Sequence, residues 1–326
     1  MTFLDSPHAQ AKCVDCHVGP TASEQFSAKL NGLRQLAGTL TGDWERPIPT
    51  PVHDLPAARD SCGRCHWPEK YLGAKLVVHS RFRDDRQTSG YTNVLLMRTG
   101  GTHPDGKATG IHWHTNPRVS VDYVAADEDR MDVRWIKAVR EDGSERIFTV
   151  EGTPHDAPPD GHARQMDCTD CHNRTGHDFD EPDDAIDRAI AAGLIPRSLP
   201  FIKKIAVDVL HTEFARVSAA RSIEAAMRTR YDREGLLDER TRPLVDKAAA
   251  EVARIWQRNI YPERAQTWGT YVDLKSHAGC FRCHDGDHKD QAGEVLTNRC
   301  DACHVVLSEE EEDPAILRTL GIDLGR

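Results

Sequence analysis

Every cysteine in this chain lies in one repeated motif, Cys-x-x-Cys-His. Two thiols three residues apart, followed at once by an imidazole, form the attachment signature of c-type haem. The thiols add to the two porphyrin vinyl groups, and the histidine becomes the proximal ligand of the iron. A Cys-x-x-Cys pair alone would suit a zinc ribbon or a redox disulfide, but neither of those needs the histidine. We therefore predict five covalently bound haem c groups, numbered in chain order, at Cys13, Cys16 and His17; Cys62, Cys65 and His66; Cys168, Cys171 and His172; Cys280, Cys283 and His284; and Cys300, Cys303 and His304.

The remaining histidines could supply the sixth ligands of the irons. The sequence has 17 histidines, so twelve are left after the five proximal ones. This surplus favours bis-histidine ligation, which gives low-spin irons at lower potentials than histidine–methionine ligation. A histidine close to one motif should serve a neighbouring haem, because it cannot easily reach across its own porphyrin. The first set of distal candidates is His8, His114, His177, His277 and His288, and the second set is His53, His79, His112 and His162.

Two of these candidates flank a tryptophan in the run Ile111-His112-Trp113-His114. On a strand, both imidazoles would face the same side. One interpretation makes one of them a distal ligand. Another makes them a polar pair beside an exposed iron edge, and a third makes them an ordinary surface pair.

Composition limits the other functions that this chain could have. Apolar residues make up 38% and aromatic residues 6%, which is little for a core of this size, so large apolar cofactors should replace side-chain packing. The net charge of −10 argues against nucleic acid as a partner. The acidic run at residues 309–313 is typical of a solvated tail, or of a docking patch for a basic redox protein.

The sequence contains no apolar stretch long enough to cross a bilayer and no visible signal peptide. Haem c is attached outside the cytoplasmic membrane in bacteria. We therefore expect a periplasmic or otherwise extracytoplasmic protein, whose export signal or anchor is not part of this sequence.

Local patterns predict an α+β multihaem cytochrome c in three regions. Residues 1–73 should bind haems 1 and 2 with little regular structure, because they are rich in turn formers such as Pro47 and Pro51. Residues 74–150 show alternating apolar positions and a hairpin turn at Asp142-Gly143, which indicate a small antiparallel β insertion. Residues 151–326 should bind haems 3 to 5 in a largely helical region, since apolar residues recur there at helical spacing.

The residues around two motifs carry a more specific likeness. Segments 166–174 and 279–286, together with 111–114, resemble multihaem cytochromes of the NapC/NirT type. That resemblance implies a periplasmic protein that passes electrons from membrane quinol to soluble redox partners. Members of that family typically carry an N-terminal membrane helix, and the simplest bind four haems, whereas this sequence shows five motifs and no such helix.

Three functions are consistent with these features. The first is a non-catalytic electron carrier with a chain of mostly bis-histidine haems between a quinol-linked donor and a redox partner. The second is a reductase of a small nitrogen or sulfur oxyanion with one open iron; its candidate site residues are His103, His112, His114, Tyr123 and Arg118. The third is an electron-conducting subunit of a larger cytochrome assembly, with haems 4 and 5 at its contact end.

Overall fold

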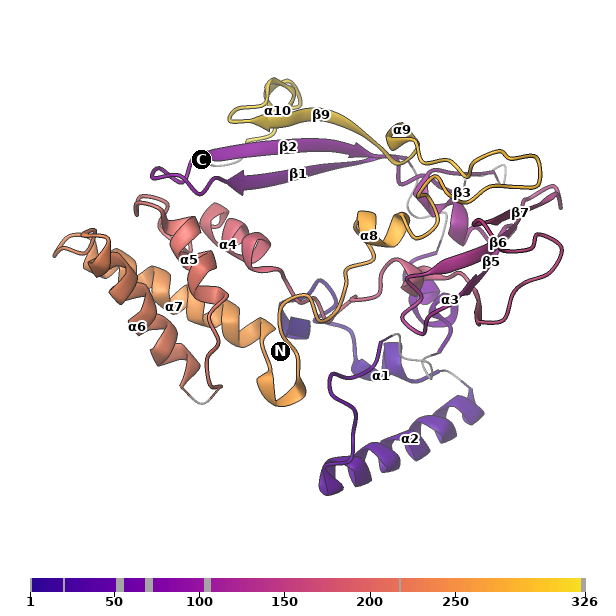
Figure 1. Cartoon of the computed structure of the whole chain (residues 1–326), viewed down its shortest axis with the longest axis horizontal. Helices are drawn as coiled ribbons and strands as arrows, with labels where there is room; N and C mark the ends of the chain where they lie inside the picture. The colour runs from indigo at the N-terminus through magenta and orange to yellow at the C-terminus, as the bar shows by residue number, and fades with distance from the viewer. Residues whose placement is uncertain are drawn as a thin grey trace.

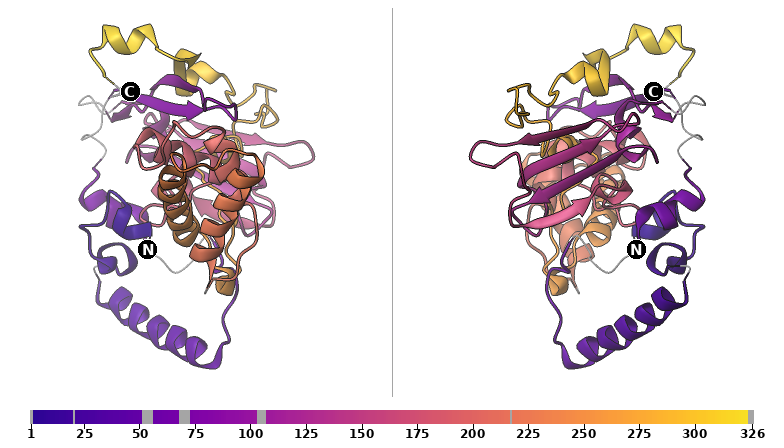
Figure 2. Two further views of the ribbon diagram at one scale, coloured as in Figure 1. Left: turned by 90° about the vertical axis from the view of Figure 1, so that its left-hand side faces the viewer. Right: turned by 90° about the vertical axis from the view of Figure 1, so that its right-hand side faces the viewer.

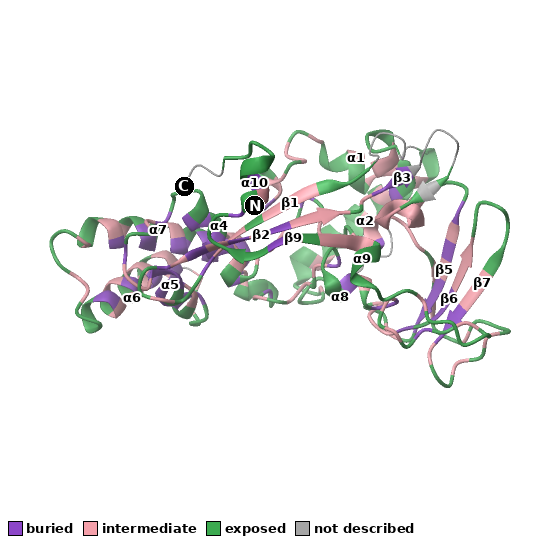
Figure 3. Ribbon diagram, turned by 90° about the horizontal axis from the view of Figure 1, so that it is seen from above, coloured by how far each residue is buried: buried purple, intermediate pink, exposed green. Residues whose placement is uncertain are grey.

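The computed structural model describes residues 2–19, 21–50, 56–67, 73–102, 107–216 and 218–323. It confirms a mixed α+β chain. A helical bundle occupies one end, a four-stranded antiparallel sheet occupies the other, and a long three-stranded sheet extends between them (Figure 1; Figure 3).

The long sheet has the strand order β1-β2-β9 and is antiparallel throughout. Its strands are β1 (Lys75–Phe82), β2 (Gly90–Met97) and β9 (His304–Glu311). The acidic run is therefore not a tail for most of its length, because residues 309–311 belong to β9. Glu310 is held there by the amide of Asn93, to which its backbone donates, and by an ion pair with Arg83.

The second sheet has the order β7-β6-β5-β8. The turn predicted at Asp142-Gly143 joins β6 to β7, and Gly143 has the positive φ of 81° that such a turn favours. The two sheets are separate, and each includes one strand from outside the 74–150 region in which a single β unit was expected. The strands of this sheet are β5 (Ser120–Ala125), β6 (Val133–Val139), β7 (Glu145–Thr149) and β8 (His162–Gln165); β3 (Gly101–Thr102) and β4 (Ala108–Thr109) form a small separate pair.

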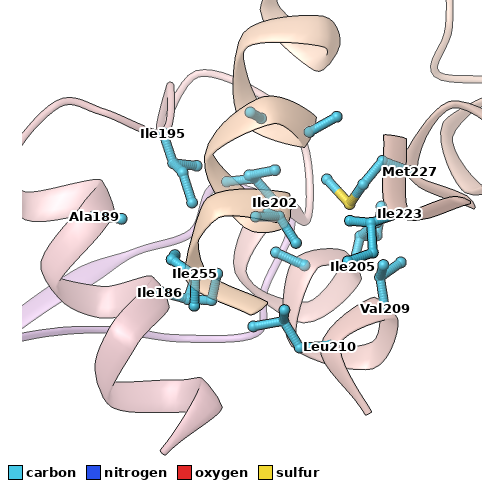
Figure 4. Packing of buried hydrophobic residues seen from close by; sticks show 14 of the residues in the cluster. Ile186, Ala189, Ile195, Ile202, Ile205, Val209, Leu210, Ile223, Met227 and Ile255 are labelled. Atoms are coloured by element: carbon cyan, nitrogen blue, oxygen red, sulfur yellow. The ribbon is translucent and has the colours of Figure 1, made fainter. Parts of the chain in front are cut away.

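Four helices form the main hydrophobic core, as their apolar periodicity predicted (Figure 4). A buried lysine of this bundle is hydrogen-bonded to the long sheet. Lys203 donates to the Phe82 carbonyl at 2.8 Å and lies 2.9 Å from Asp187. Burial raises the pKa of Asp187 although Lys203 and Arg81 act in the opposite direction. The helices are α4 (Pro182–Ala191), α5 (Ile202–Leu210), α6 (Ala219–Arg233) and α7 (Arg242–Asn259).

The N-terminal region contains a long helix, which corrects the prediction of little regular structure around haems 1 and 2. Helix α2 (Ala22–Thr41) extends beside the body of the molecule, and none of its residues is buried (Figure 2). The side chain of Thr21 accepts from the Glu24 amide at its start, and Gly42 ends it in the left-handed conformation. One face carries exposed apolar side chains, at Phe26, Leu30, Leu33, Leu36 and Leu40.

Shorter helices are η1 (Thr2–Asp5), α3 (Ala58–Ser61), η6 (Pro262–Arg264) and α10 (Ala315–Thr319). Within the described residues, no helix combines the length and the apolar character that a membrane span needs.

Candidate haem centres

Each of the five motifs lies in or beside a short helical turn. Such a turn places residues i and i+3 on one face, so the two thiols of a motif point to the same side. In motifs 2, 3 and 4 the amide of the histidine donates to the carbonyl of the first cysteine, at 2.8 Å for His66 and His172 and 3.0 Å for His284. None of the ten cysteines forms a disulfide. The turns are α1 (Cys13–His17), η2 (Cys62–Arg64), η5 (Cys168–Asp170), α8 (His277–Cys280) and α9 (Cys300–Cys303).

Each proximal histidine faces one other histidine ring. The distances between ring centres all lie between 6.0 and 6.4 Å. The partners come from distant parts of the chain and not from the motif's own turn. The five pairs are His17 with His177 at 6.1 Å, His66 with His8 at 6.0 Å, His172 with His112 at 6.4 Å, His284 with His114 at 6.0 Å, and His304 with His277 at 6.0 Å.

This spacing matches the space that an iron needs between two imidazoles. With metal–nitrogen bonds of about 2.0 Å, the centres of two ligating rings would lie roughly 6.3 Å apart. Among the described residues, no group of three His, Cys, Asp or Glu side chains gathers to hold a bare metal ion. Two axial histidines and two thiols are what the protein must provide to a haem c, whose porphyrin supplies the other four nitrogens. The residues present therefore fit haem and do not fit zinc.

Hydrogen bonds at the fourth centre also set which nitrogen of each ring would be available to an iron. Nδ1 of His114 lies 2.7 Å from the Ile111 carbonyl, and Nδ1 of His284 lies 2.6 Å from the Thr297 carbonyl. A carbonyl only accepts, so both Nδ1 atoms carry a proton, and both Nε2 atoms keep the lone pair that binds a metal. Burial lowers the pKa of His114, which also favours its neutral, ligating form.

The run that carries His112 and His114 is a 3₁₀-helix, η4 (Ile111–Thr115), and not the strand that was expected. A 3₁₀-helix turns by about 120° per residue, so residues two apart point in different directions. His112 accordingly faces His172, while His114 faces His284. Gly110 opens this turn with a φ of 66°, and a Cβ there would lie 2.4 Å from the carbonyl oxygen of Arg98. One short turn thus places a ring at each of two centres.

His288, from the first set of candidates, has a different environment. It is buried, its Nδ1 lies 3.0 Å from the Asp285 carboxylate, and its Nε2 lies 3.1 Å from the Val133 carbonyl. Both ring nitrogens of His288 therefore take part in hydrogen bonds. The ring that faces the proximal His172 is instead His112, a candidate of the second set.

The other candidates of the second set face no proximal ring in the part of the chain that the structure describes. His79 lies on β1 opposite Asn93, where burial and Arg81 lower the pKa of its imidazole. His162 lies on β8 opposite Ala125. His53 lies outside the described residues, as does His103 of the reductase hypothesis.

The five motifs follow one another in space in their sequence order. Burial and the nearby Cys62 thiol raise the pKa of Cys16, which places motif 1 beside motif 2. A hydrogen bond between the Cys62 and Cys168 thiols lowers the pKa of the former and raises that of the latter, so motif 2 lies beside motif 3. Burial and the Cys280 thiol raise the pKa of Cys171 to about 11, which connects motif 3 to motif 4. Burial and the Cys303 thiol likewise raise the pKa of Cys280, and motif 5 therefore follows motif 4.

Asp170 and Arg282, which sequence reasoning did not single out, lie inside motifs 3 and 4 between the two cysteines of each. Both are buried, and Arg282 donates to the backbone carbonyl of Asp170 at 2.7 Å. The sequence signal for these two residues is a charged side chain directly before the second cysteine of each motif. That signal is weak, because a turn on the protein surface would accept a charged residue there as well.

Comparisons with known proteins agree with this geometry. The chain is 36% identical over 315 residues to the cytochrome c-type protein ImcH of Geobacter sulfurreducens. The match covers 94% of this chain but 62% of that relative, so the chain spans less than two thirds of the relative's length. No family model and no solved structure matches the chain. The similarity and the repeated motif together support a c-type cytochrome that binds haem c covalently.

Proposed function

We propose that this protein is a periplasmic pentahaem cytochrome that passes electrons along five bis-histidine, low-spin haems between a quinol-linked donor and a redox partner. One observation carries the proposal: every proximal histidine faces a second histidine at the spacing of a six-coordinate iron. The haems supply reversible one-electron chemistry, while the protein sets their spacing, ligands and burial. The proposed relationship to the NapC/NirT type is part of this proposal.

The assigned distal ligands are His177, His8, His112, His114 and His277, for haems 1 to 5 in that order. The sequential neighbourhood of the motifs supports a single path from haem 1 to haem 5. An electron entering at either end would pass each haem once. Haems 1 and 5 are the proposed sites for exchange with donor and acceptor.

The reductase alternative would need one iron with an open or displaceable sixth position. Two of its site residues, His112 and His114, instead face proximal rings. A third, Tyr123, is buried and donates to Asp170. These contacts favour electron relay over catalysis.

The larger-assembly alternative places its contact end at haems 4 and 5, whereas the exposed apolar face of α2 lies between motifs 1 and 2 and would be a different contact surface. Exposed apolar patches of this kind mark surfaces that bind other molecules. Sedimentation of the purified holoprotein over a wide concentration range tests whether this face is an interface. If it is, we expect self-association or a bound partner subunit. A strict monomer that binds no other cytochrome would count against an interface at this face.

The relay proposal is tested on the purified holoprotein by three measurements. Its intact mass should show five attached haems, its ferric electron paramagnetic resonance spectrum should contain only low-spin signals, and the ferrous protein should bind no carbon monoxide. Reduction of all five haems by a quinol analogue in the presence of a donor-bearing membrane fraction tests the quinol link. A high-spin ferric signal or carbon monoxide binding would overturn the relay.

A further inference from the structure

Arg282 occupies a socket of backbone carbonyls between two haem-attachment turns. Its Nε donates to the Gly279 carbonyl at 3.0 Å, its Nη1 to the Arg130 carbonyl at 2.8 Å, and its Nη2 to the Asp170 carbonyl at 2.7 Å. The three acceptors come from the turn before motif 4, the loop between β5 and β6, and motif 3. Only 8% of the residue is exposed. A guanidinium group donates in a fixed planar fork, so it holds these three segments in one geometry.

The carboxylate of Asp170 does not neutralise Arg282, because other donors already surround it. Arg164 donates to both of its oxygens, at 2.9 and 3.1 Å, and Tyr123 and the Asp167 amide donate as well. Three guanidinium groups (Arg130, Arg164 and Arg282) and two carboxylates (Asp167 and Asp170) meet here, and Arg282 is the one of the three guanidinium groups that donates to backbone carbonyls instead of pairing with a carboxylate.

The charge of Arg282 lies beside the attachment sites of both haems. Arg282 stands between the two cysteines of motif 4, and its Nη2 donates to the carbonyl of Asp170, the residue directly before Cys171 of motif 3. Reduction adds one electron to an iron, so a nearby buried positive charge stabilises the reduced form more than the oxidised form. The effect is large where water cannot screen it.

We propose that Arg282 is a positioning residue that fixes haem 3 relative to haem 4 and raises the reduction potentials of these two haems together. The proposal rests on the proposed electron-relay function. In a chain with a net charge of −10, this buried guanidinium makes the middle of the relay the favoured place for an electron. An electron that arrives from haem 2 is then held at the haem 3–haem 4 pair until haem 5 is oxidised.

Substitutions in the holoprotein test the charge and the geometry separately. Arg282→Gln removes the charge, and we expect the potentials of two of the five haems to shift to lower values in a spectroelectrochemical titration. Arg282→Lys keeps the charge but loses the planar fork, so the potentials should move less while electron transfer between haems 3 and 4 slows. Arg299→Gln is the matched control, since Arg299 directly precedes motif 5 but its side chain is 75% exposed; it should leave all five potentials unchanged.

A second substitution covers the case in which Arg282→Gln fails to fold or to bind its haems. Asp170→Asn removes the negative charge and keeps the carbonyl that accepts from Arg282, so the same two potentials should shift to higher values. Its control is Asp301→Asn, at an exposed position within motif 5. Unchanged potentials in Arg282→Gln or Asp170→Asn, or an equal shift of all five, would overturn the proposal. Such a result with five low-spin haems still present would leave the relay itself intact, whereas a high-spin iron in the unaltered protein would contradict the relay.

Discussion

His17 and His177 face each other with 6.1 Å between their ring centres, although 160 positions separate them in the sequence. His177 is only five residues beyond His172, the proximal histidine of haem 3. The turn after motif 3 therefore brings its imidazole opposite the histidine of motif 1. That a histidine close to one motif serves another haem stays a prediction, and this pair is the place to test it.

His177→Ala should leave haem 1 with an open position, because the facing imidazole is removed while both thioether bonds remain. The variant is expected to show one high-spin ferric iron and to bind carbon monoxide at one haem in five after reduction. Absorption and resonance spectra of the purified protein measure both effects. His155→Ala is the control, since His155 contacts the Thr149 hydroxyl at 3.1 Å instead of a proximal ring; carbon monoxide binding by the control but not by the His177 variant would contradict the pairing.

His112→Ala and His288→Ala should have opposite consequences. The first should open the iron of haem 3 and leave the fold intact. The second should keep five low-spin irons but lower the free energy of unfolding by about 1–3 kcal/mol, because it removes two hydrogen bonds from a buried site and leaves their partners unpaired. Resonance spectra and denaturant unfolding separate the two outcomes. A high-spin iron in the His288 variant would contradict this assignment, because it would show that His288 is an iron ligand in the haem-loaded protein.

The angle between paired imidazoles differs most between haems 3 and 4. The planes of His112 and His172 lie 25° apart, while those of His114 and His284 lie 80° apart. Near-parallel ligands separate the iron d orbitals and give a rhombic low-spin spectrum, whereas near-perpendicular ligands give a strongly anisotropic signal. We expect the ferric spectrum to contain both types, with the anisotropic signal reduced in His114→Ala and the rhombic one reduced in His112→Ala. Five rhombic signals would contradict this geometry.

The helical bundle should be the part of the chain that depends least on haem. Its core contains no motif residue, whereas motifs 1 and 2 lie in turns with few buried side chains. In protein produced without haem attachment, hydrogen exchange should be slow in α5 and α7 and fast in residues 13–17. Exchange of α5 as fast as that of α1 would be the contrary result.

Within that bundle, Ile223→Ala should lower the free energy of unfolding by about 2–5 kcal/mol, since Ile223 is fully buried and its loss leaves a cavity. Leu194→Ala is the matched control at a position that is 42% exposed, where a change within about 0.5 kcal/mol is expected. Denaturant unfolding followed by circular dichroism measures both. Equal losses in the two variants would mean that this core is not the stabilising unit.

Patterns with a local cause could be predicted from the sequence. The apolar spacing that predicts α4 to α7 and the Asp142-Gly143 turn are both properties of a few adjacent residues. Helix α2 also has local signals: a Thr21-x-x-Glu24 capping pattern, apolar residues at spacings of four and three, and Gly42 at its end. The prediction of little regular structure gave more weight to the prolines that follow this helix than to its own helix signals.

Other features depend on contacts that no local pattern encodes. Strand β9 is rich in acidic residues, and only pairing with β2 makes it a strand. The choice of His112 over His288 depends on which rings the fold brings opposite His172 and on the two acceptors that surround His288. The region boundaries at residues 73 and 150 remain predictions.

The exchange of ligands between distant turns has a consequence for how the protein is made. A chain that emerges from its N-terminus presents motif 1 first, but under this pairing the iron there gains its second imidazole only when His177 has followed. His114 is present long before the fourth haem that it faces, 170 positions later. Haems 1 and 3 would then close within five residues of each other, at His177 and His172. Premature termination before His177 would leave haem 1 reactive instead of merely shortening the relay.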